Sequence, residues 1–490
     1  MKVFKYLENK AHYRLIWNLK ISLIISDTER KNKSEMHLIV KNEILQSNNI
    51  AIKDDLGNTI TYEELFYEAQ ELRKNIRERS LIIIICDHSF ETVKIFYKCL
   101  TINCVPILLG ADIESEFLEK IITTYQPEYI WCKKNYIASS SYSDIFTENT
   151  YNILKINKNK SEIHKDLALL LSTSGSTGSA KMVKISYENL YDNIHYVCLH
   201  CDIEKGQKGI TALPFNYTYG FCFCLWHWYC GATLLLTKSS IVSNSFNEFF
   251  SKEQANNFAA IPYTFQMLNR LKFWDKRKLS NLHFAMSAGA QMSDALQKEM
   301  ISLMGNKFWL AYGQTEVTCV VAGTNFNNDD IKLGTVGKPF QNVKIWIDEN
   351  NGEMMIEGKT VSMGYALSKE DLLIGDVNNR LVRTGDRAII DREGYIYLKG
   401  RLNRYIKILG NRIDLDEIEK FLSRQIPDCE LACVGAEDEI VIFYSAEEDM
   451  ESKITLELHK LHVPHKYIKF YCIDELPRNE AGKILYSKLV

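Results

Sequence analysis

Two patterns of hydrophobic and polar positions alternate along the first part of the chain. Short runs rich in β-branched residues predict buried strands at 81–86 (LIIIIC) and 105–109 (VPILL), and residues 90–101 between them have apolar positions at helical spacing. A second unit starts with a strand at 167–171 (LALLL) and passes through a loop of small residues into a helix over 187–199. Strands that alternate with helices are typical of largely parallel sheets, so the pattern predicts an α/β fold.

The pattern changes after about residue 340. Strand-like runs closed by turns, at 343–347, 353–357, 388–390 and 395–398, predict a β-rich subdomain. The polar segment 400–404 (GRLNR) lies between two strand-like runs and predicts a domain boundary. We therefore expect a large multi-subdomain body with mixed sheets over residues 1–400 and a small α+β C-terminal lid domain over residues 401–490.

Composition and charge exclude several classes of protein. The 490 residues contain 59 Lys and Arg against 62 Asp and Glu, so no excess of positive charge attracts nucleic acid. The apolar run 221–236 is too short for a spanning helix and contains His227 and Gly231, so we expect no membrane span. The 13 cysteines are scattered, and charged residues interrupt the first 26 positions where a secretory signal would lie, which favours free thiols in the cytoplasm.

The loop after the 167–171 strand is the sharpest local signal. Its run of small and hydroxylated residues offers backbone N–H groups and hydroxyls to phosphate oxygens, and a lysine adds a cation at its end. A flexible linker is the alternative, but a linker has no reason to follow a buried strand directly and to precede a helix. The spacing is Gly-x-x-Gly-x-x-Lys, which differs from the nucleotide-binding loop that has four residues between Gly and Gly-Lys. The candidate phosphate-binding residues are Thr173, Ser174, Gly175, Ser176, Thr177, Gly178 and Lys181.

Motifs in a fixed order connect this loop to the rest of the chain. After the loop come 312–316 (YGQTE), 383–386 (RTGD), Gly400–Arg401 with 406–419, and 476–484 (LPRNEAGKI), and 61–65 (TYEEL) precedes it. Together they resemble the signature of the adenylate-forming, or AMP-binding, enzyme superfamily, which includes acyl-CoA synthetases, peptide-synthetase adenylation domains and luciferases. The resemblance spans almost the whole chain.

The resemblance implies a two-step ligase that uses ATP and Mg²⁺. A carboxylic acid attacks the α-phosphate of ATP and releases pyrophosphate, and a thiol then takes the acyl group from the adenylate. Because the first step brings anions together, the site must supply positive charge and orientation. The family pattern assigns Lys483 as the mobile catalytic cation, Thr315 as a donor to the α-phosphate and Glu316 as the Mg²⁺ ligand. Asp386 and Arg401 bind the ribose in this pattern, and Gly289, Ala290, Tyr312 and Gly313 surround the adenine.

The second step in the family depends on rotation of the C-terminal domain about a hinge, which makes that domain a mobile lid. The hinge falls at Asn403 here, where the family more often has Asp or Lys. Lys407 and Gly410 match the family positions that serve the thioester-forming arrangement of the rotated domain, and the resemblance gives Arg412 a contact to phosphate there. The pantetheine thiol that accepts the acyl group is carried either by CoA or by a carrier protein. The acceptor itself is not readable from the sequence.

Several positions depart from the family pattern. Ala180 replaces the usual Pro, Met182 stands where Gly is common, and Ala481 replaces the usual Ser. Tyr486 occupies a position where a basic residue often stands. None of these changes removes a group that adenylation requires, so we expect an active enzyme from a divergent branch.

The acid substrate is predicted from the segment 213–220 (LPFNYTYG). Tyr217, or with a one-residue shift Asn216, takes the place of a histidine found in many acyl- and aryl-CoA ligases. Amino-acid-activating relatives have an Asp in this region, but no acidic residue occurs between Pro214 and Thr237. We therefore expect a carboxylic acid without a free α-ammonium. The aromatic residues Tyr219, Phe221 and Trp226 either line the acid pocket or belong to the core.

Three alternatives remain open at this point. A stand-alone ligase could deliver its acyl group to an amine or to a carrier protein, because no carrier domain is attached. A nucleotide-binding regulator without turnover would need no catalytic lysine, so the presence of Lys483 disfavours it. A zinc site at His195, Cys198, His200 and Cys201 is disfavoured because these residues follow one another around a single predicted helix.

Overall fold

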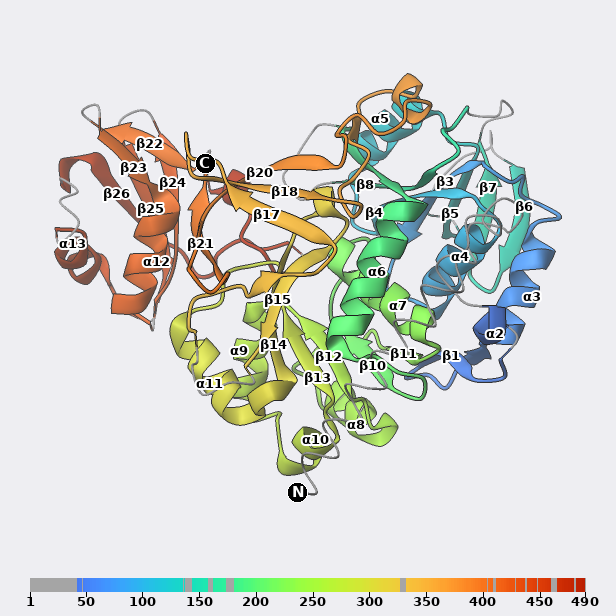
Figure 1. The fold of residues 1–490 in the computed structure, drawn as a ribbon, viewed down its shortest axis with the longest axis horizontal. Helices are drawn as coiled ribbons and strands as arrows, with labels where there is room; N and C mark the ends of the chain where they lie inside the picture. Colours follow the sequence, from blue (N-terminus) through green and yellow to red (C-terminus); the bar gives the residue numbers. More distant parts are fainter. Residues whose placement is uncertain are drawn as a thin grey trace.

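The computed structural model describes residues 42–45, 47–134, 136, 143–156, 162–172, 180–326, 332–402, 404–408, 411–427, 429–436, 439–446, 448–459, 465–479 and 482–489. Its elements form an α/β arrangement of large mixed sheets, a β-rich subdomain and a C-terminal α+β unit (Figure 1). The predicted fold class is therefore confirmed.

One large sheet has eight strands within the described residues, in the order β19-β9-β8-β4-β3-β5-β7-β6. Its centre, β8-β4-β3-β5, is parallel, and antiparallel strands flank it on both sides. The central strands are buried along their length, which explains their continuous apolar sequences. The strands are β3 (Leu81–Cys86), β4 (Val105–Gly110), β5 (Tyr129–Lys133), β6 (Ser143–Glu148), β7 (Tyr151–Lys155), β8 (Leu167–Ser172), β9 (Met182–Ser186) and β19 (Tyr365–Ala366).

The other large sheet has nine strands within the described residues, in the order β16-β15-β14-β13-β12-β10-β11-β1-β2. It is parallel from β14 to β1 and antiparallel at both ends. The strands are β1 (Ile50–Asp54), β2 (Thr59–Thr61), β10 (Lys208–Thr211), β11 (Thr233–Leu236), β12 (Asn257–Ala260), β13 (Phe284–Ser287), β14 (Phe308–Gly313), β15 (Val320–Asn325) and β16 (Lys338–Pro339).

Helices fill the space between the two large sheets. Helix α4 contacts β1 of one sheet and β3 and β4 of the other, and α6 contacts β15 and β9 in the same way. Helix α7 packs beside α6 and is buried over nearly its whole length (Figure 1). The helices of the body are α2 (Asn42–Leu45), α3 (Tyr62–Leu72), α4 (Phe90–Thr101), α5 (Ser115–Tyr125), α6 (Tyr187–Cys201), α7 (Thr218–Cys230), α8 (Asn244–Glu253), α9 (Pro262–Arg270), α10 (Lys276–Asn281) and α11 (Asp294–Met304), with the 3₁₀ turns η3 (Gly305–Lys307), η4 (Thr315–Val317) and η5 (Glu370–Leu372).

The predicted β-rich subdomain is a four-stranded antiparallel sheet within the described residues, in the order β17-β18-β20-β21. Its strands are β17 (Val343–Ile347), β18 (Glu353–Gly358), β20 (Leu381–Ile390) and β21 (Ile396–Arg401). It carries the Thr-Gly-Asp motif on β20 and ends at Arg401, next to the predicted domain boundary.

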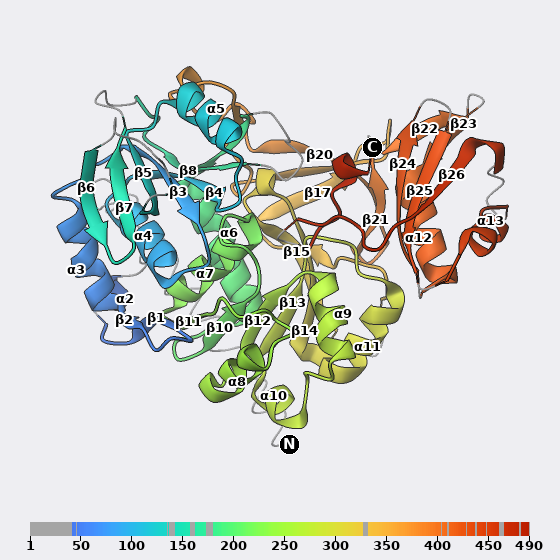
Figure 2. The same ribbon diagram turned by 180° about the vertical axis from the view of Figure 1, so that it is seen from behind.

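The segment after Arg401 has a hydrophobic core of its own. Leu422, Ile440 and Ile454 are fully buried in a cluster whose described members all follow residue 412. Figures 1 and 2 show this segment to one side of the body in both views. Its elements are β22 (Tyr405–Ile408), β23 (Asn411–Asp414), α12 (Leu415–Gln425), β24 (Glu430–Ala436), β25 (Glu439–Ser445), α13 (Glu451–His459), η6 (His465–Tyr467), β26 (Ile468–Cys472) and η7 (Tyr486–Lys488). The proposed hinge residue Asn403 lies outside the described residues.

The structure differs from the sequence prediction at the start of the second β-α unit. The loop after β8 leads into strand β9, which pairs antiparallel with β8, and helix α6 begins only at Tyr187. The candidate phosphate loop therefore connects the two strands of a hairpin and does not open a helix. The polar residue Lys184 within β9 hid this strand from the apolar pattern.

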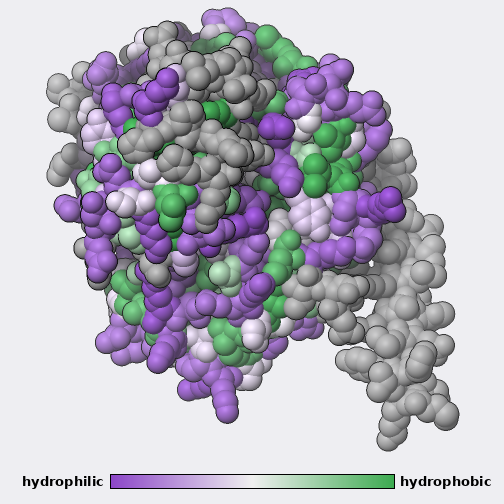
Figure 3. All heavy atoms as spheres, turned by 90° about the vertical axis from the view of Figure 1, so that its left-hand side faces the viewer, coloured by the Kyte–Doolittle hydropathy of each residue, from purple (hydrophilic) through white to green (hydrophobic). Residues whose placement is uncertain are grey.

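The apolar run 221–236 is core and not a membrane segment. It forms most of α7 and all of β11, and no helix in the described part of the chain is long and apolar enough to cross a bilayer. Figure 3 shows a face on which hydrophilic side chains predominate and hydrophobic side chains are scattered among them.

The packing of helix α7 against helix α4 is expected to contribute to the stability of the body. Trp228 is fully buried. The centre of its ring lies 4.9 Å from the ring centre of Tyr97 and 6.4 Å from that of Phe96, and both of these residues are on α4. Trp228→Ala is expected to lower the free energy of unfolding of the body by about 3–5 kcal/mol, because it leaves a cavity between helices. Urea unfolding followed by circular dichroism measures this loss. Tyr67→Ala on α3, where the side chain is exposed, is the control, and equal losses in both variants would contradict the packing assignment.

Candidate active site

Asp386 on β20 is the centre of a polar cluster formed by three separate elements. Its Oδ2 accepts hydrogen bonds of 2.6 Å from the Tyr312 hydroxyl and from the Gln314 amide, and its Oδ1 lies 3.1 Å from Nε of Arg401. The carboxylate is buried. Each of its oxygens has further acceptor capacity, so the cluster can still accept hydroxyl donors from a ligand.

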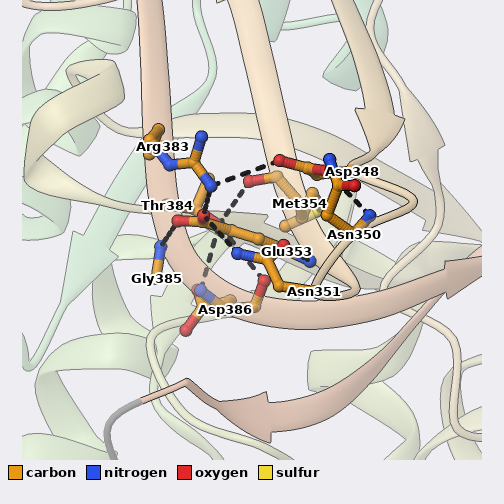
Figure 4. A network of polar contacts seen from close by, with 9 residues as sticks. All are labelled: Asp348, Asn350, Asn351, Glu353, Met354, Arg383, Thr384, Gly385 and Asp386. Atoms are coloured by element: carbon orange, nitrogen blue, oxygen red, sulfur yellow. Dashed lines mark hydrogen bonds and ion pairs between the residues drawn. The ribbon is translucent and has the colours of Figure 1, made fainter.

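A second set of contacts fixes the backbone that carries Asp386 (Figure 4). The Thr384 hydroxyl donates to the carbonyl of Met354 at 2.7 Å and accepts from the Asp386 amide at 3.1 Å. Glu353 accepts from the Gly385 amide at 3.0 Å and pairs with Arg383. The Arg-Thr-Gly-Asp segment is therefore held to β18, which leaves the Asp386 side chain little freedom.

The Tyr-Gly-Gln-Thr-Glu segment turns sharply after β14. A Cβ atom at Gly313 would lie 1.7 Å from the carbonyl oxygen of Cys319, so only glycine fits where the chain folds back on itself. The turn places Thr315 beside helix α7, where its hydroxyl is 2.8 Å from that of Thr218. Burial and the neighbouring Asp386 raise the pKa of Tyr312 well above its usual range, so its hydroxyl stays protonated and donates to Asp386.

Glu316 and Lys181 lie on either side of Tyr365. The Tyr365 hydroxyl donates to Glu316 Oε1 at 2.8 Å, and the Lys181 ammonium lies 3.4 Å from the centre of the Tyr365 ring. Strand β19, which carries Tyr365, pairs with β9 just after Lys181. Tyr365 thus joins the end of the candidate phosphate loop to the candidate metal ligand.

Lys483 reaches the body from the C-terminal segment. Its ammonium lies 5.0 Å from the centre of the Tyr217 ring, and its Cε lies 3.8 Å from the position that a Cβ on Gly289 would occupy. Burial, and to a smaller extent the nearby Arg401, lower the pKa of Lys483 to about 8, although the carboxylates of Asp386 and Glu316 act in the opposite direction. No ion pair to the Lys483 ammonium is found within the described residues, so it is a desolvated cation that an incoming anion can neutralise.

A hairpin turn presents Lys483 to the body. The Asn479 side chain accepts from the Lys483 amide at 2.9 Å, and the Asn479 carbonyl accepts from the Gly482 amide at 2.7 Å. Gly482 has a φ of +73°, and a Cβ there would lie 2.4 Å from Cδ1 of Ile261 in the body. The positive φ favours glycine next to the lysine, and any side chain at position 482 would also have to displace the end of the Ile261 side chain.

Several site residues predicted from the sequence lie outside the described residues or are not in contact with Lys483. Thr173, Ser174, Gly175, Ser176, Thr177 and Gly178 lie outside the described residues, and the side chain of Lys407 is not described. Ala290 is exposed and follows Gly289, and the Asn216 amide lies near Gly110, the last residue of β4, and Asp112. Only Tyr217 of the two substrate candidates lies beside Lys483.

The remaining aromatic and thiol candidates belong to the core. Tyr219, Phe221 and Trp226 are buried in the main hydrophobic cluster, and the Tyr219 hydroxyl donates to the Met286 carbonyl. Cys198 and Cys201 are buried as well, and no cluster of His, Cys, Asp or Glu suited to a metal ion occurs in the part of the chain that the structure describes.

The sequence analysis missed three residues that shape this site. Gln314 was visible inside its motif, but only the fold shows that its amide binds Asp386. Thr218 and Tyr365 come from elements far from their partners Thr315 and Glu316 in the sequence, so no local pattern indicates those contacts.

Comparisons with known proteins agree with this geometry. A family model described as AMP-binding enzyme matches residues 44–366, and the chain therefore belongs to the AMP-binding enzyme family. The match covers both large sheets and includes the Tyr-Gly-Gln-Thr-Glu segment.

Individual relatives cover nearly the full chain. A 2-succinylbenzoate–CoA ligase from Oceanobacillus iheyensis is 26% identical, and the match covers 92% of this chain and 98% of that protein. A D-alanine–D-alanyl carrier protein ligase from Staphylococcus haemolyticus is 24% identical, covering 87% of this chain and 92% of that one. The structure of o-succinylbenzoate CoA synthetase from Bacillus subtilis with its acyl-adenylate intermediate has a TM-score of 0.74 at 19% identity, covering 91% and 96% of the two chains. This likeness confirms the fold.

The contact between Gly482 and Ile261 is expected to control the position of Lys483. The positive φ alone costs an alanine at position 482 about 1–2 kcal/mol, and the overlap of its Cβ with Cδ1 of Ile261 adds to this cost at the contact that places Lys483. Gly482→Ala is therefore expected to reduce any reaction that needs Lys483 by at least roughly tenfold. The rate of pyrophosphate exchange measures this loss.

Gly394→Ala is the matched control, because Gly394 also has a positive φ but no atom lies within 4 Å of a Cβ placed there. A loss of exchange in Gly394→Ala as large as that in Gly482→Ala would show that backbone strain anywhere in the chain, and not contact with Ile261, is responsible.

Proposed function

We propose that this chain is an ATP- and Mg²⁺-dependent acid–thiol ligase. A carboxylate oxygen of the acid attacks the α-phosphorus of ATP, which forms an acyl-adenylate and releases pyrophosphate. A pantetheine thiol then attacks the acyl carbon, which forms a thioester and releases AMP and a proton. The relatives named as CoA ligases and carrier protein ligases support both steps.

The position of Lys483 carries this proposal. A buried ammonium without a carboxylate partner in the described residues, beside Asp386 and Arg401, supplies the positive charge that two reacting anions require. Its lowered pKa supports this role, because strongly shifted pKa values are frequent among residues of functional sites. A nucleotide-binding regulator would have no use for such a cation, which disfavours the non-catalytic alternative.

The other site residues fit the binding of ATP. Asp386, fixed by Tyr312 and Gln314, would accept the ribose hydroxyls, and Arg401 would add a contact to the sugar. Thr315 would donate to the α-phosphate and Glu316 would hold Mg²⁺, whose charge would offset that of the phosphates. The loop 173–178 and Lys181 would bind the remaining phosphates, and Gly289, Ala290 and Gly313 would lie along the adenine.

The second step would use a different arrangement of the C-terminal domain, residues 401–490. Rotation about Asn403 would withdraw Lys483 and bring Lys407 to the site. The separate core of this segment supports its movement as a unit.

The acid substrate would be an acyl, aryl or N-substituted carboxylic acid. Tyr217 lies against Lys483, where the carboxylate would be activated, and its ring and hydroxyl would contact the acid. Helix α7 has no acidic residue, so it offers no partner for a free α-ammonium.

The acceptor would be CoA or a separate carrier protein, and both present the same pantetheine arm. A stand-alone ligase that transfers to an amine is the alternative, and competition between CoA and an amine for a supplied adenylate distinguishes them. We also propose a cytoplasmic location and no role in nucleic-acid binding, supported by the free cysteines and the balanced charge.

Lys483→Ala is expected to abolish carboxylate-dependent pyrophosphate exchange, because the variant loses the cation proposed to bridge the acid carboxylate and the α-phosphate. The measurement is exchange across a panel of acyl, aryl, hydroxy and N-acylated amino acids, with ATP binding followed by calorimetry. Binding should survive in the variant. Lys488→Ala, which removes an exposed lysine from the same segment, is the matched control. Unchanged exchange in Lys483→Ala would refute the proposed role.

Lys407→Ala is expected to impair thioester formation while adenylate formation stays near normal, because Lys407 would face the site only after the domain rotates. Pyrophosphate exchange and thioester formation from a supplied adenylate measure the two steps separately. An equal loss of both steps would contradict the proposal of two domain positions.

A further inference from the structure

Arg404 is the first described residue after the proposed hinge at Asn403, and it is tied firmly into the C-terminal segment. Its guanidinium pairs with Asp416 and, at 2.8 Å, with Glu419 on helix α12. It also donates to the Cys433 carbonyl on β24 at 2.7 Å. The side chain is only about a fifth exposed, so these contacts are largely removed from water.

Tyr486 closes the same cluster from the C-terminal end of the chain. The Arg404 guanidinium carbon lies 3.9 Å from the centre of the Tyr486 ring, and the Tyr486 hydroxyl donates to Glu419 Oε2 at 2.9 Å. Glu419 also accepts from the Cys433 amide at 2.6 Å. Hydrogen bonds thus join Arg404, Glu419 and Tyr486 into one connected cluster with the Cys433 backbone, which rigidifies this part of the domain.

The charges of the cluster depend on one another. Burial raises the pKa of Glu419, and the adjacent Arg404 opposes this rise. Without Arg404 the Glu419 carboxylate would be left desolvated and short of positive charge. Tyr486 occupies a position where the family often has a basic residue. Here a guanidinium, that of Arg404 near the start of the domain, lies over the Tyr486 ring.

The cluster lies close to Lys483 along the chain. Two residues lie between Lys483 and Tyr486. The amide of the second, Leu485, donates to the Pro477 carbonyl at 2.8 Å, and the first, Ile484, forms a β-bridge with Arg478. The hairpin that carries Lys483 is thus anchored at Tyr486, and Tyr486 is anchored to the residue that follows the hinge.

We propose that Arg404, Glu419 and Tyr486 form a positioning clamp that transmits the domain orientation to Lys483. The inference rests on the proposed function, because it assigns to the clamp the placement of Lys483 during adenylation. The clamp does not touch the reacting atoms. Its loss should therefore impair adenylation, which needs Lys483 in place, and spare thioester formation from a supplied adenylate, which does not.

Arg404→Met and Tyr486→Leu test the clamp from its two sides. Each is expected to reduce carboxylate-dependent pyrophosphate exchange by roughly 10²-fold, the effect of a displacement of about 1 Å at a catalytic group. Thioester formation from a supplied adenylate should stay within about twofold of the unsubstituted chain, since positioning of Lys483 alone is lost. Tyr486→Leu keeps the Arg404–Glu419 pair, so it remains informative even where Arg404→Met destabilises the domain.

One conservative variant and one control distinguish the contribution of the Tyr486 ring from that of its hydroxyl and from a general loss of charge. Tyr486→Phe keeps the ring over Arg404 and loses only the hydrogen bond to Glu419, so most of the exchange should return. Lys469→Met removes an exposed cation of the same domain, paired with Glu439 on β25, and should change neither step.

Normal pyrophosphate exchange in both Arg404→Met and Tyr486→Leu would overturn the inference. An equal loss of exchange and of thioester formation would overturn it as well, because it would indicate a merely structural role. Absence of exchange in the unsubstituted chain with every acid would overturn the proposed function and the clamp together, whereas loss in Lys483→Ala with normal exchange in the clamp variants overturns the clamp alone.

Discussion

The desolvated ammonium of Lys483 is the interaction on which the rest of the site depends. Burial and the neighbouring Arg401 disfavour its charge, and within the described residues it has no ion-pair partner. Such a cation is costly to hold in place unless an anion arrives to share it. The site thus favours a ligand that brings negative charge to a point between Tyr217, Asp386 and Glu316.

The remaining contacts fix the orientation of Asp386 and join the C-terminal segment to the body. Asp386 is held by Tyr312, Gln314 and Arg401, so its orientation is set before a ligand binds. The tight fit of Gly482 against Ile261 and the ion pair of Arg424 with Asp294, 2.7 Å apart, connect the C-terminal segment to the body in this arrangement. Because Lys483 comes from one side of that contact and Asp386 from the other, the complete site exists only when the two parts meet.

Much of the fold could be predicted from the sequence, and the motifs that carry the candidate site residues could be located there, for identifiable reasons. Strands β3 and β4 are buried on both faces, which leaves continuous apolar runs, and the motifs around Asp386, Thr315 and Lys483 keep their spacing. Strand β9 was missed because Lys184 interrupts it, although its stem is buried and its ammonium donates to the Ile374 carbonyl at 2.8 Å. The contacts of Thr218 with Thr315 and of Arg404 with Tyr486 join segments far apart in sequence, so only the folded chain shows them.

The pH dependence of adenylation tests the central role of Lys483 most directly. The lowered pKa means that its ammonium loses its proton as the pH rises through about 8, so kcat/KM for carboxylate-dependent pyrophosphate exchange should fall through that range. In Lys483→Arg, whose guanidinium stays protonated, the fall should move to higher pH. The same fall in both proteins, or none below the ordinary titration range of lysine, would contradict the account.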